Sequence, residues 1–193
     1  MARDTRSALL DAGSALFLEK GYSSVGLNEI LEKAGAPKGS FYHYFESKED
    51  FACAIVRRGS ECFRETLTRR LTDPERSPLE RLQFHFDAQI DHMKSLNFNQ
   101  CCFFLKLGTE MAATSKLMKE TLDEVLEGWL SIIADCIREG QENGSISTLH
   151  SAKELAGVLH NLWEGASLSA QIQHDAKPLV AAAAFMQKTL AAR

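Results

Sequence analysis

The sequence predicts an all-α protein of about nine helices. Apolar residues recur at spacings of three and four through most of the 193 positions, strand alternation is absent, and β-branched residues are scattered. Proline, glycine and capping residues divide this pattern into segments of helical length. Two of the segments are short and flank a tight Ala34-Gly35-Ala36 turn, which is typical of a helix-turn-helix. We expect a three-helix DNA-binding domain at residues 1–50 and a second helical domain at residues 51–193.

The first three helices are expected within the first 45 residues. Helix 1 ends at Gly21, helix 2 covers residues 26–33, and helix 3 covers residues 37–44. Helix 3 is expected to begin at Pro37, because the first N–H of a helix has no intrahelical partner and proline loses nothing there. The residues expected to face inward are Leu9, Ala12, Leu16, Phe17, Leu27, Ile30 and Leu31.

Helix 4 follows directly and is expected to continue to Leu71. Ser47 is the predicted N-cap, with Asp50 in the third helical position of a capping box. Its predicted buried residues are Phe51, Ala54, Ile55, Cys62 and Phe63. Two prolines within residues 72–78 then interrupt the helical pattern. Five further helices are predicted at 79–95, 101–113, 116–142, 151–174 and 178–192.

The short third helix carries the side chains most informative about function. Phe41 and Phe45 are four residues apart and supply an inward face. The other side chains, which include a lysine, a serine, a histidine and two tyrosines, are left to face outward. In a helix-turn-helix protein the second helix of the motif lies in the major groove of DNA. We therefore interpret residues 37–45 as a DNA-reading helix.

This region resembles the DNA-binding domain of the TetR family of bacterial repressors over about residues 5–55. The resemblance is carried by Gly21-Tyr22, residues 27–31, Ala34-Gly35, residues 38–45 and residues 47–49. It implies contacts with or near base edges for Lys38, Gly39, Ser40 and His43, and contacts with phosphates for Tyr42 and Lys48. Tyr44 is open to either a DNA contact or inward packing. Gly26 stands where the family often has threonine.

Charge and hydropathy place the chain among ordinary globular proteins. Its net charge is −4, but residues 1–60 carry 8 basic and 8 acidic side chains, whereas residues 61–193 carry 14 and 18. A neutral reader can still bind DNA when its lysines face the phosphates and its acids face away. No apolar run approaches the roughly 18 residues of a membrane span. We expect a soluble, cytoplasmic protein with no membrane partner.

The sequence offers little support for catalysis. No phosphate-binding glycine loop, no H-E-x-x-H pair and no G-x-S-x-G elbow is present. The five cysteines lack the spacing of metal ligands. No metal and no cofactor is therefore expected. Two alternatives stay open: a small α-helical cysteine-dependent enzyme that uses Cys102 or His85, and a dimeric adaptor that does not bind DNA.

The C-terminal helices predict a homodimer. A wide apolar stripe runs through residues 155–166, small residues at 165–170 permit close helix approach, and the last helix is rich in alanine. In the TetR family the two last helices form a four-helix dimer interface. A two-fold dimer also accounts for a palindromic operator in double-stranded DNA.

Cys102 is the candidate sensor thiol. Lys106 lies one helical turn away, and an adjacent ammonium and a helix start both favour the thiolate. Residues 37–45, 102–107 and 162–166 resemble one TetR branch, which includes the N-ethylmaleimide- and electrophile-responsive repressor and acrylate-responsive relatives. There a cysteine matching Cys102 senses electrophiles or oxidants; Gln171 stands where some members have a lysine. A buried, inert thiol is the other interpretation.

The function expected is that of a dimeric repressor that responds to a small-molecule or electrophilic effector. Phe86, Trp129 and Trp163 are expected as core residues or as the wall of a mostly apolar effector pocket. Effector binding, or modification of Cys102, would favour a dimer with the wrong separation of its reader helices. An effector acts only through its different affinities for the two states.

Overall fold

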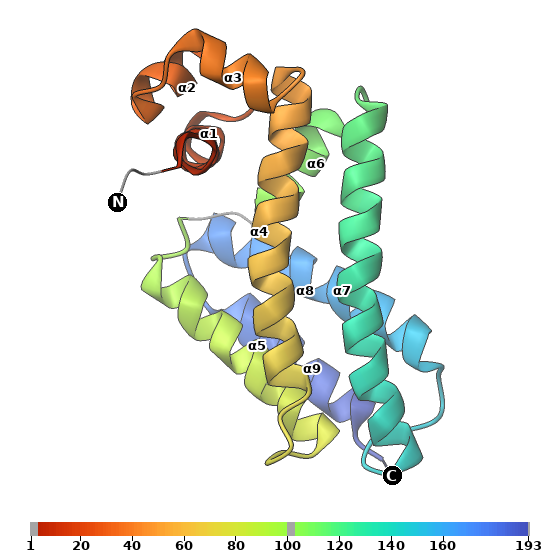
Figure 1. Cartoon of the computed structure of the whole chain (residues 1–193). Coiled ribbons are helices and arrows are strands. Elements are labelled where there is room, and N and C mark those ends of the chain that lie inside the picture. Colours follow the sequence, from red (N-terminus) through yellow and green to blue (C-terminus); the bar gives the residue numbers. More distant parts are fainter. Residues whose placement is uncertain (1–3, 100–102, 193) are drawn as a thin grey trace. The chain divides into compact units, whose positions relative to one another are not determined.

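The computed structural model describes residues 4–99 and 103–192, and this part of the chain contains nine helices. Figure 1 shows their order. They are α1 (Thr5–Lys20), α2 (Leu27–Ala34), α3 (Lys38–Tyr44), α4 (Lys48–Leu71), α5 (Pro78–Ser95), α6 (Phe103–Met111), α7 (Lys116–Glu142), α8 (Ala152–Gln173) and α9 (Lys177–Leu190). The all-α prediction is confirmed, and the predicted helix limits agree within a few residues.

The chain forms two compact units, each with its own core. Unit 1 consists of Met1–Glu61 and Cys102–Val125, and unit 2 consists of Cys62–Cys101 and Leu126–Arg193. Unit 1 therefore contains α1 to α3 and α6 together with the first parts of α4 and α7. None of the helices in the described ranges is long and apolar enough to cross a membrane.

The core of unit 1 is built around phenylalanine rings from α1, α3 and α4. Phe41 contacts Phe45 and Phe51 at centroid distances of 5.4 and 5.2 Å, and Phe17 lies 6.0 Å from Phe51. Phe17, Phe41 and Phe51 are completely buried. Aromatic rings bury large areas and favour such edge and tilted contacts. These contacts supply the tertiary packing that a seven-residue helix needs, because short helices are marginal alone.

The turn between α2 and α3 requires glycine. Gly35 has φ 63° and ψ 31°, which is the left-handed region, and this position ends α2. Its N–H donates to the carbonyl of Glu32, and the next N–H, from Ala36, donates to the carbonyl of Leu31. This pattern satisfies carbonyls that the helix end leaves without partners. The backbone then enters α3 through Pro37, which is the N-cap and not the first helical residue as predicted.

The start of α7 is held within unit 1 by side chains of α4. The hydroxyl of Ser115 accepts from the N–H of Met118 at 2.9 Å and donates to the carboxylate of Glu49. About two turns further along each helix, the guanidinium of Arg57 donates to the hydroxyl of Thr121 at 3.0 Å. These bonds connect the helix after the reader to α7.

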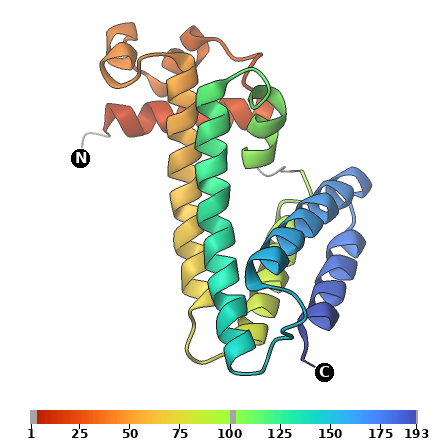
Figure 2. The same ribbon diagram turned by 90° about the vertical axis from the view of Figure 1, so that its right-hand side faces the viewer.

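Unit 2 contains α5, α8 and α9, which pack side by side (Figure 2). Complete capping boxes begin two of them: Ser77 with Glu80 at α5, and Ser151 with Glu154 at α8. Arg81 is 6% exposed and joins three segments. It donates to the carbonyls of Asp73 at 2.6 Å and Leu71 at 3.3 Å, and to the carboxylate of Glu139 at 2.6 Å.

Several predicted side-chain positions are wrong. Cys62 is exposed, and Phe63 is only partly buried, although its ring contacts Trp129. Ser47 caps Asp50 as predicted, at 3.0 Å, but the Asp50 carboxylate accepts from the N–H of Glu46 and so does not complete the box. Ala166, assigned to close packing between protomers, is 8% exposed and lies in the core of its own protomer.

Candidate nucleic-acid interface and effector-binding region

The surface of α3 separates into a buried aromatic side and an exposed polar side. Phe41 and Phe45 are 0% and 3% exposed, whereas Lys38, Gly39 and His43 are exposed and Ser40 is partly exposed. A Cβ added at Gly39 would meet nothing within 4 Å, so the backbone is open to close approach there. The sequence-predicted base-reading residues therefore form one accessible surface.

The tyrosines of α3 are also accessible. Tyr42 is 57% exposed and contacts Phe41 in an edge-to-face arrangement, with ring centroids 5.5 Å apart. Tyr44 is 37% exposed and contacts the rings of His43 at 4.7 Å and Phe45 at 6.2 Å. Tyr44 thus combines partial inward packing with an accessible edge, and both interpretations of this residue remain possible.

The ammonium of Lys48 is directed into unit 1. Its Nζ donates to the carbonyl of Tyr22 at 2.6 Å and lies 4.1 Å from the centre of the Tyr22 ring. Desolvation lowers the pKa of Lys48, against an opposite effect of the Glu110 carboxylate. In this structure Lys48 stabilises the loop after α1. Its phosphate contact, implied by the family resemblance, stays a prediction that would require the side chain to leave Tyr22.

Two charged residues of α6 hold the end of α1 and the loop that follows. Lys106 donates to the carbonyl of Leu18, and Glu110 accepts from the N–H of Ser23 at 3.2 Å. A Cβ at Gly21 would lie 2.6 Å from the Glu110 carboxylate, and Gly21 has φ 83°, so glycine fits here for two reasons. Sequence reasoning missed Glu110 and assigned Lys106 only to thiol activation. Their partners are about 90 positions away along the chain, so no local pattern indicates them.

The thiols of the described residues differ sharply in accessibility. Cys53 and Cys136 are buried, and burial raises the pKa of both, that of Cys136 to about 12. Cys62 is exposed. Cys102, the predicted sensor, lies outside the described residues, as does Cys101. Because Cys62 is accessible, the reactivity of Cys102 toward electrophiles has to be compared with that of Cys62.

Unit 2 contains an aromatic cluster that includes all three predicted pocket-wall residues. Phe63 of α4 contacts Trp129 of α7 at 4.8 Å, and Phe86 of α5 contacts Trp163 of α8 at 4.8 Å. The ring of His85 connects the two pairs, at 6.2 Å from Phe63 and 5.4 Å from Phe86. Phe86, Trp129 and Trp163 are each less than 10% exposed. We call these five residues the aromatic cluster.

Two ionisable groups of unit 2 are strongly affected by burial. Desolvation, with a smaller effect of the Arg70 guanidinium, lowers the pKa of His85 to about 4. Desolvation raises the pKa of Glu164 to about 7. No group in the described residues hydrogen-bonds Nδ1 of His85 or Oε2 of Glu164. Sequence reasoning missed Glu164, for which the available signal was a lone acid within the apolar run after Trp163.

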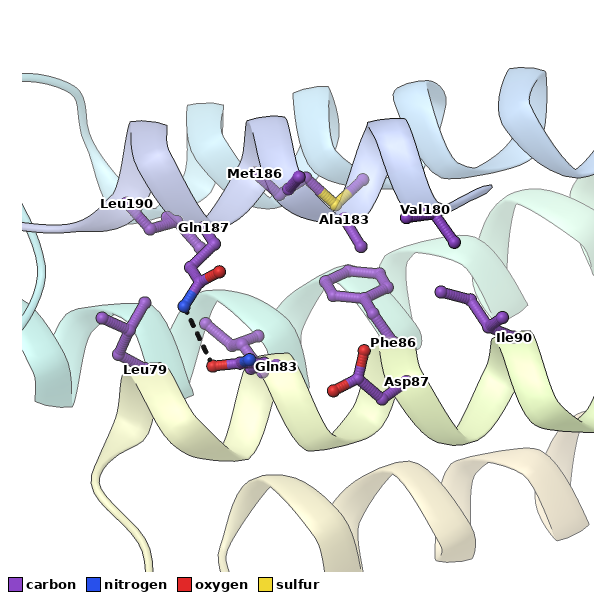
Figure 3. A pocket seen from close by; sticks show the side chains of 12 residues that line it. Leu79, Gln83, Phe86, Asp87, Ile90, Val180, Ala183, Met186, Gln187 and Leu190 are labelled. Atoms are coloured by element: carbon purple, nitrogen blue, oxygen red, sulfur yellow. Dashed lines mark hydrogen bonds between the residues drawn. The ribbon is translucent and has the colours of Figure 1, made fainter. Parts of the chain in front are cut away.

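A groove of about 190 Å³ lies between α5 and α9 (Figure 3). Phe86 stands between the two helices with its ring directed toward α9. Gln187 donates to Gln83 across the groove at 3.1 Å, and Asp87 is the only charged residue among those that line it. The remaining lining residues are Leu79, Leu82, Ile90, Val180, Ala183, Ala184, Met186 and Leu190.

Five large apolar side chains on α8 and α9 are exposed. Val158, Leu168 and Ile172 on α8 are 60%, 53% and 72% exposed, and Val180 and Phe185 on α9 are 51% and 60% exposed. Most of the predicted dimer stripe instead faces the protomer core, namely Leu155, Leu159, Trp163 and Ala166. Large exposed apolar surfaces of this kind mark interaction sites. We call Val158, Leu168, Ile172, Val180 and Phe185 the α8–α9 apolar surface.

Metal binding has no support in the geometry. Among the residues described, no group of three or more histidine, cysteine or acidic side chains is placed to hold a metal ion. His160, which is half-buried, has its pKa lowered by desolvation, as expected for a histidine in the protein interior.

Related proteins align with almost the whole length of this chain. The repressor NemR of Escherichia coli K12 is 32% identical over 188 residues, which cover 97% of this chain and 94% of NemR. The regulator AcuR of Cereibacter sphaeroides is 38% identical over 172 residues, which cover 89% of this chain and 78% of AcuR. The crystal structure of reduced E. coli NemR superposes with a TM-score of 0.89 and covers 98% of each chain. These relatives are named as regulators, so the enzyme alternative is set aside.

Family matches cover both parts of the sequence. Residues 9–55, which include α3, match bacterial regulatory proteins of the tetR family. Residues 78–186, from α5 into α9, match the tetracyclin repressor-like C-terminal domain. The chain therefore combines a helix-turn-helix that exposes its polar residues with the C-terminal domain of the same family. It belongs to the TetR family of DNA-binding transcriptional regulators.

Proposed function

We propose that the protein is a dimeric repressor that binds a palindromic operator and leaves it when an effector binds or modifies the C-terminal part of the chain. Residues 1–50 read DNA, and residues 51–193 dimerise and hold the effector. The observation that carries this proposal is the surface of α3, where Lys38, Tyr42 and His43 are exposed above a buried Phe41. Family membership supports the same interpretation.

Two substitutions on α3 separate base reading from phosphate contact. His43→Ala should reduce the preference for the operator over variant duplexes by about 1–3 kcal/mol, because it removes a base-edge contact. Tyr42→Phe removes one hydroxyl and should weaken binding to all duplexes alike. Both positions are exposed, so neither change should alter folding. Binding isotherms on operator and scrambled duplexes measure both effects, and an unchanged preference in His43→Ala would exclude this base contact.

Dimerisation through α8 and α9 accounts for the α8–α9 apolar surface. Leu168→Glu should convert the dimer to monomers at micromolar concentration, because burying an unpaired carboxylate costs several kcal/mol. Leu149→Glu is the matched control, since Leu149 is 81% exposed and lies outside both helices. Sedimentation velocity distinguishes the two variants. A Leu168→Glu protein that stays fully dimeric would remove this surface from the interface.

We propose that α6 transmits the effect of the effector to the DNA-reading helix α3. Lys106 and Glu110 hold the end of α1 and the loop after it, so a displacement of α6 would move the segment that supports the reader. Electrophile modification of Cys102, which precedes α6 in the sequence, is one such trigger, and reversible effector binding in unit 2 is the other. DNA release of a Cys102→Ser protein by electrophiles would leave reversible binding as the explanation.

A further inference from the structure

His85 is a buried polar side chain inside an apolar environment. It is 4% exposed, and no group in the described part of the chain hydrogen-bonds its Nδ1. A buried polar atom without a partner is unfavourable, so any molecule that hydrogen-bonds it binds with that penalty relieved. The aromatic rings of Phe63 and Phe86 lie close to the imidazole, with ring centroids 6.2 and 5.4 Å away.

The α5–α9 groove shares one residue, Phe86, with the aromatic cluster. Phe86 lines the groove and also contacts His85 and Trp163, so its ring belongs both to the groove and to the aromatic cluster. A change of its side-chain rotamer would connect the two. The groove volume of about 190 Å³ suits a small molecule, since an apolar cavity of about 150 Å³ already holds one the size of benzene.

We propose that unit 2 binds a small, uncharged, flat molecule with one hydrogen-bonding group, anchored by His85 within the aromatic cluster and admitted through the α5–α9 groove. This inference rests on the proposed effector-binding role of the C-terminal part and adds the chemical class of its ligand. The aromatic rings select a flat apolar body, and His85 selects the polar group.

The charges around the cluster favour a neutral ligand. With its pKa lowered to about 4, the imidazole is uncharged at neutral pH and acts as a hydrogen-bond partner, not as a counter-ion. A cation or an anion would have to lose its hydration on entering this buried apolar cluster, which is costly. Asp87, at the groove, disfavours an anion further.

Four singly substituted benzenes test the assignment: benzyl alcohol, toluene, benzoate and benzylamine, titrated into the full-length protein. Both tryptophans of the chain belong to the cluster, so their fluorescence reports binding directly. Benzyl alcohol and toluene should bind, and the two charged compounds should bind at least about ten-fold more weakly. His85→Leu should reduce the affinity ratio of benzyl alcohol to toluene by about 3- to 10-fold, the effect of one hydrogen bond.

Two matched controls keep this test independent of folding. His92→Leu makes the same change at an exposed position of α5 and should leave the ratio unchanged. Ala183→Phe fills the groove and should weaken binding of both neutral compounds, whereas Ala113→Phe, at an exposed position outside the groove, should not. The thermal midpoint of His85→Leu should not fall, because leucine removes a polar atom that has no protein partner.

An unchanged alcohol-to-toluene ratio in His85→Leu, or tightest binding of benzoate or benzylamine, would overturn the proposal. Undiminished binding to Ala183→Phe would overturn the groove as the entrance. These binding measurements need no DNA, so they are separable from the proposed function. If ligand binding depends on His85 but does not release the protein from its operator, only the proposed effector response is contradicted. If an effector releases the operator but binds His85→Leu as tightly as the wild type, only the ligand assignment is contradicted.

Discussion

Phe41→Ala abolishes operator binding while unit 2 stays folded: this is the largest effect we expect on function. Phe41 is completely buried and contacts Phe45 and Phe51, and α3 has only seven residues. A buried phenylalanine replaced by alanine typically costs 3–5 kcal/mol, which is a large part of the stability of a small domain. Without this anchor the exposed residues of α3 lose their common orientation toward DNA.

Electrophoretic or fluorescence binding to the operator duplex measures the loss. Tryptophan fluorescence reports separately on unit 2, because Trp129 and Trp163 both lie there. Phe84→Ala is the control, since Phe84 is 43% exposed and on α5. Wild-type operator affinity in Phe41→Ala would mean that the reader does not depend on this core.

Arg81→Ala should give the largest loss of stability in unit 2. The change leaves the carbonyls of Leu71 and Asp73 and the carboxylate of Glu139 without their shared donor. Unsatisfied buried groups cost about 1–3 kcal/mol each, but Glu139 is half exposed and regains water. We expect the free energy of unfolding to fall by about 2–4 kcal/mol.

Urea denaturation followed by fluorescence gives this value. Arg138→Ala is the matched control, because Arg138 forms an exposed ion pair with Asp135 three residues away. Its effect should stay within about 0.5 kcal/mol. Equal losses in the two variants would mean that the bonds of Arg81 to the chain before α5 contribute no more than a surface ion pair.

Helix positions were predictable from the sequence because local chemistry determines them. Gly21 and Gly35 end α1 and α2, and Ser47 caps α4, as the sequence predicts. The alternation of buried and exposed residues on α3 was predictable for the same reason. Phe41 and Phe45 lie four apart, and a helix of seven residues has only one face to bury.

The directions of long charged side chains were not predictable. Lys48, Lys106 and Glu110 bind backbone groups 26 to 88 positions away, and such partners leave no periodic signal. The division of α8 between core and surface was also missed, because apolar residues surround most of this helix. Trp163 and Ala166 face the protomer core, whereas Leu168 and Ile172 face outward.

Selection from a pool of random-sequence duplexes tests the central claim most directly. The wild-type dimer should enrich an inverted repeat, because two-fold symmetry presents two copies of α3 to two half-sites. Affinity for the enriched duplex should fall steeply with salt, while its preference over random DNA persists. Enrichment of no sequence, or of a single unrepeated half-site bound by one protomer, would contradict a dimeric operator-binding regulator.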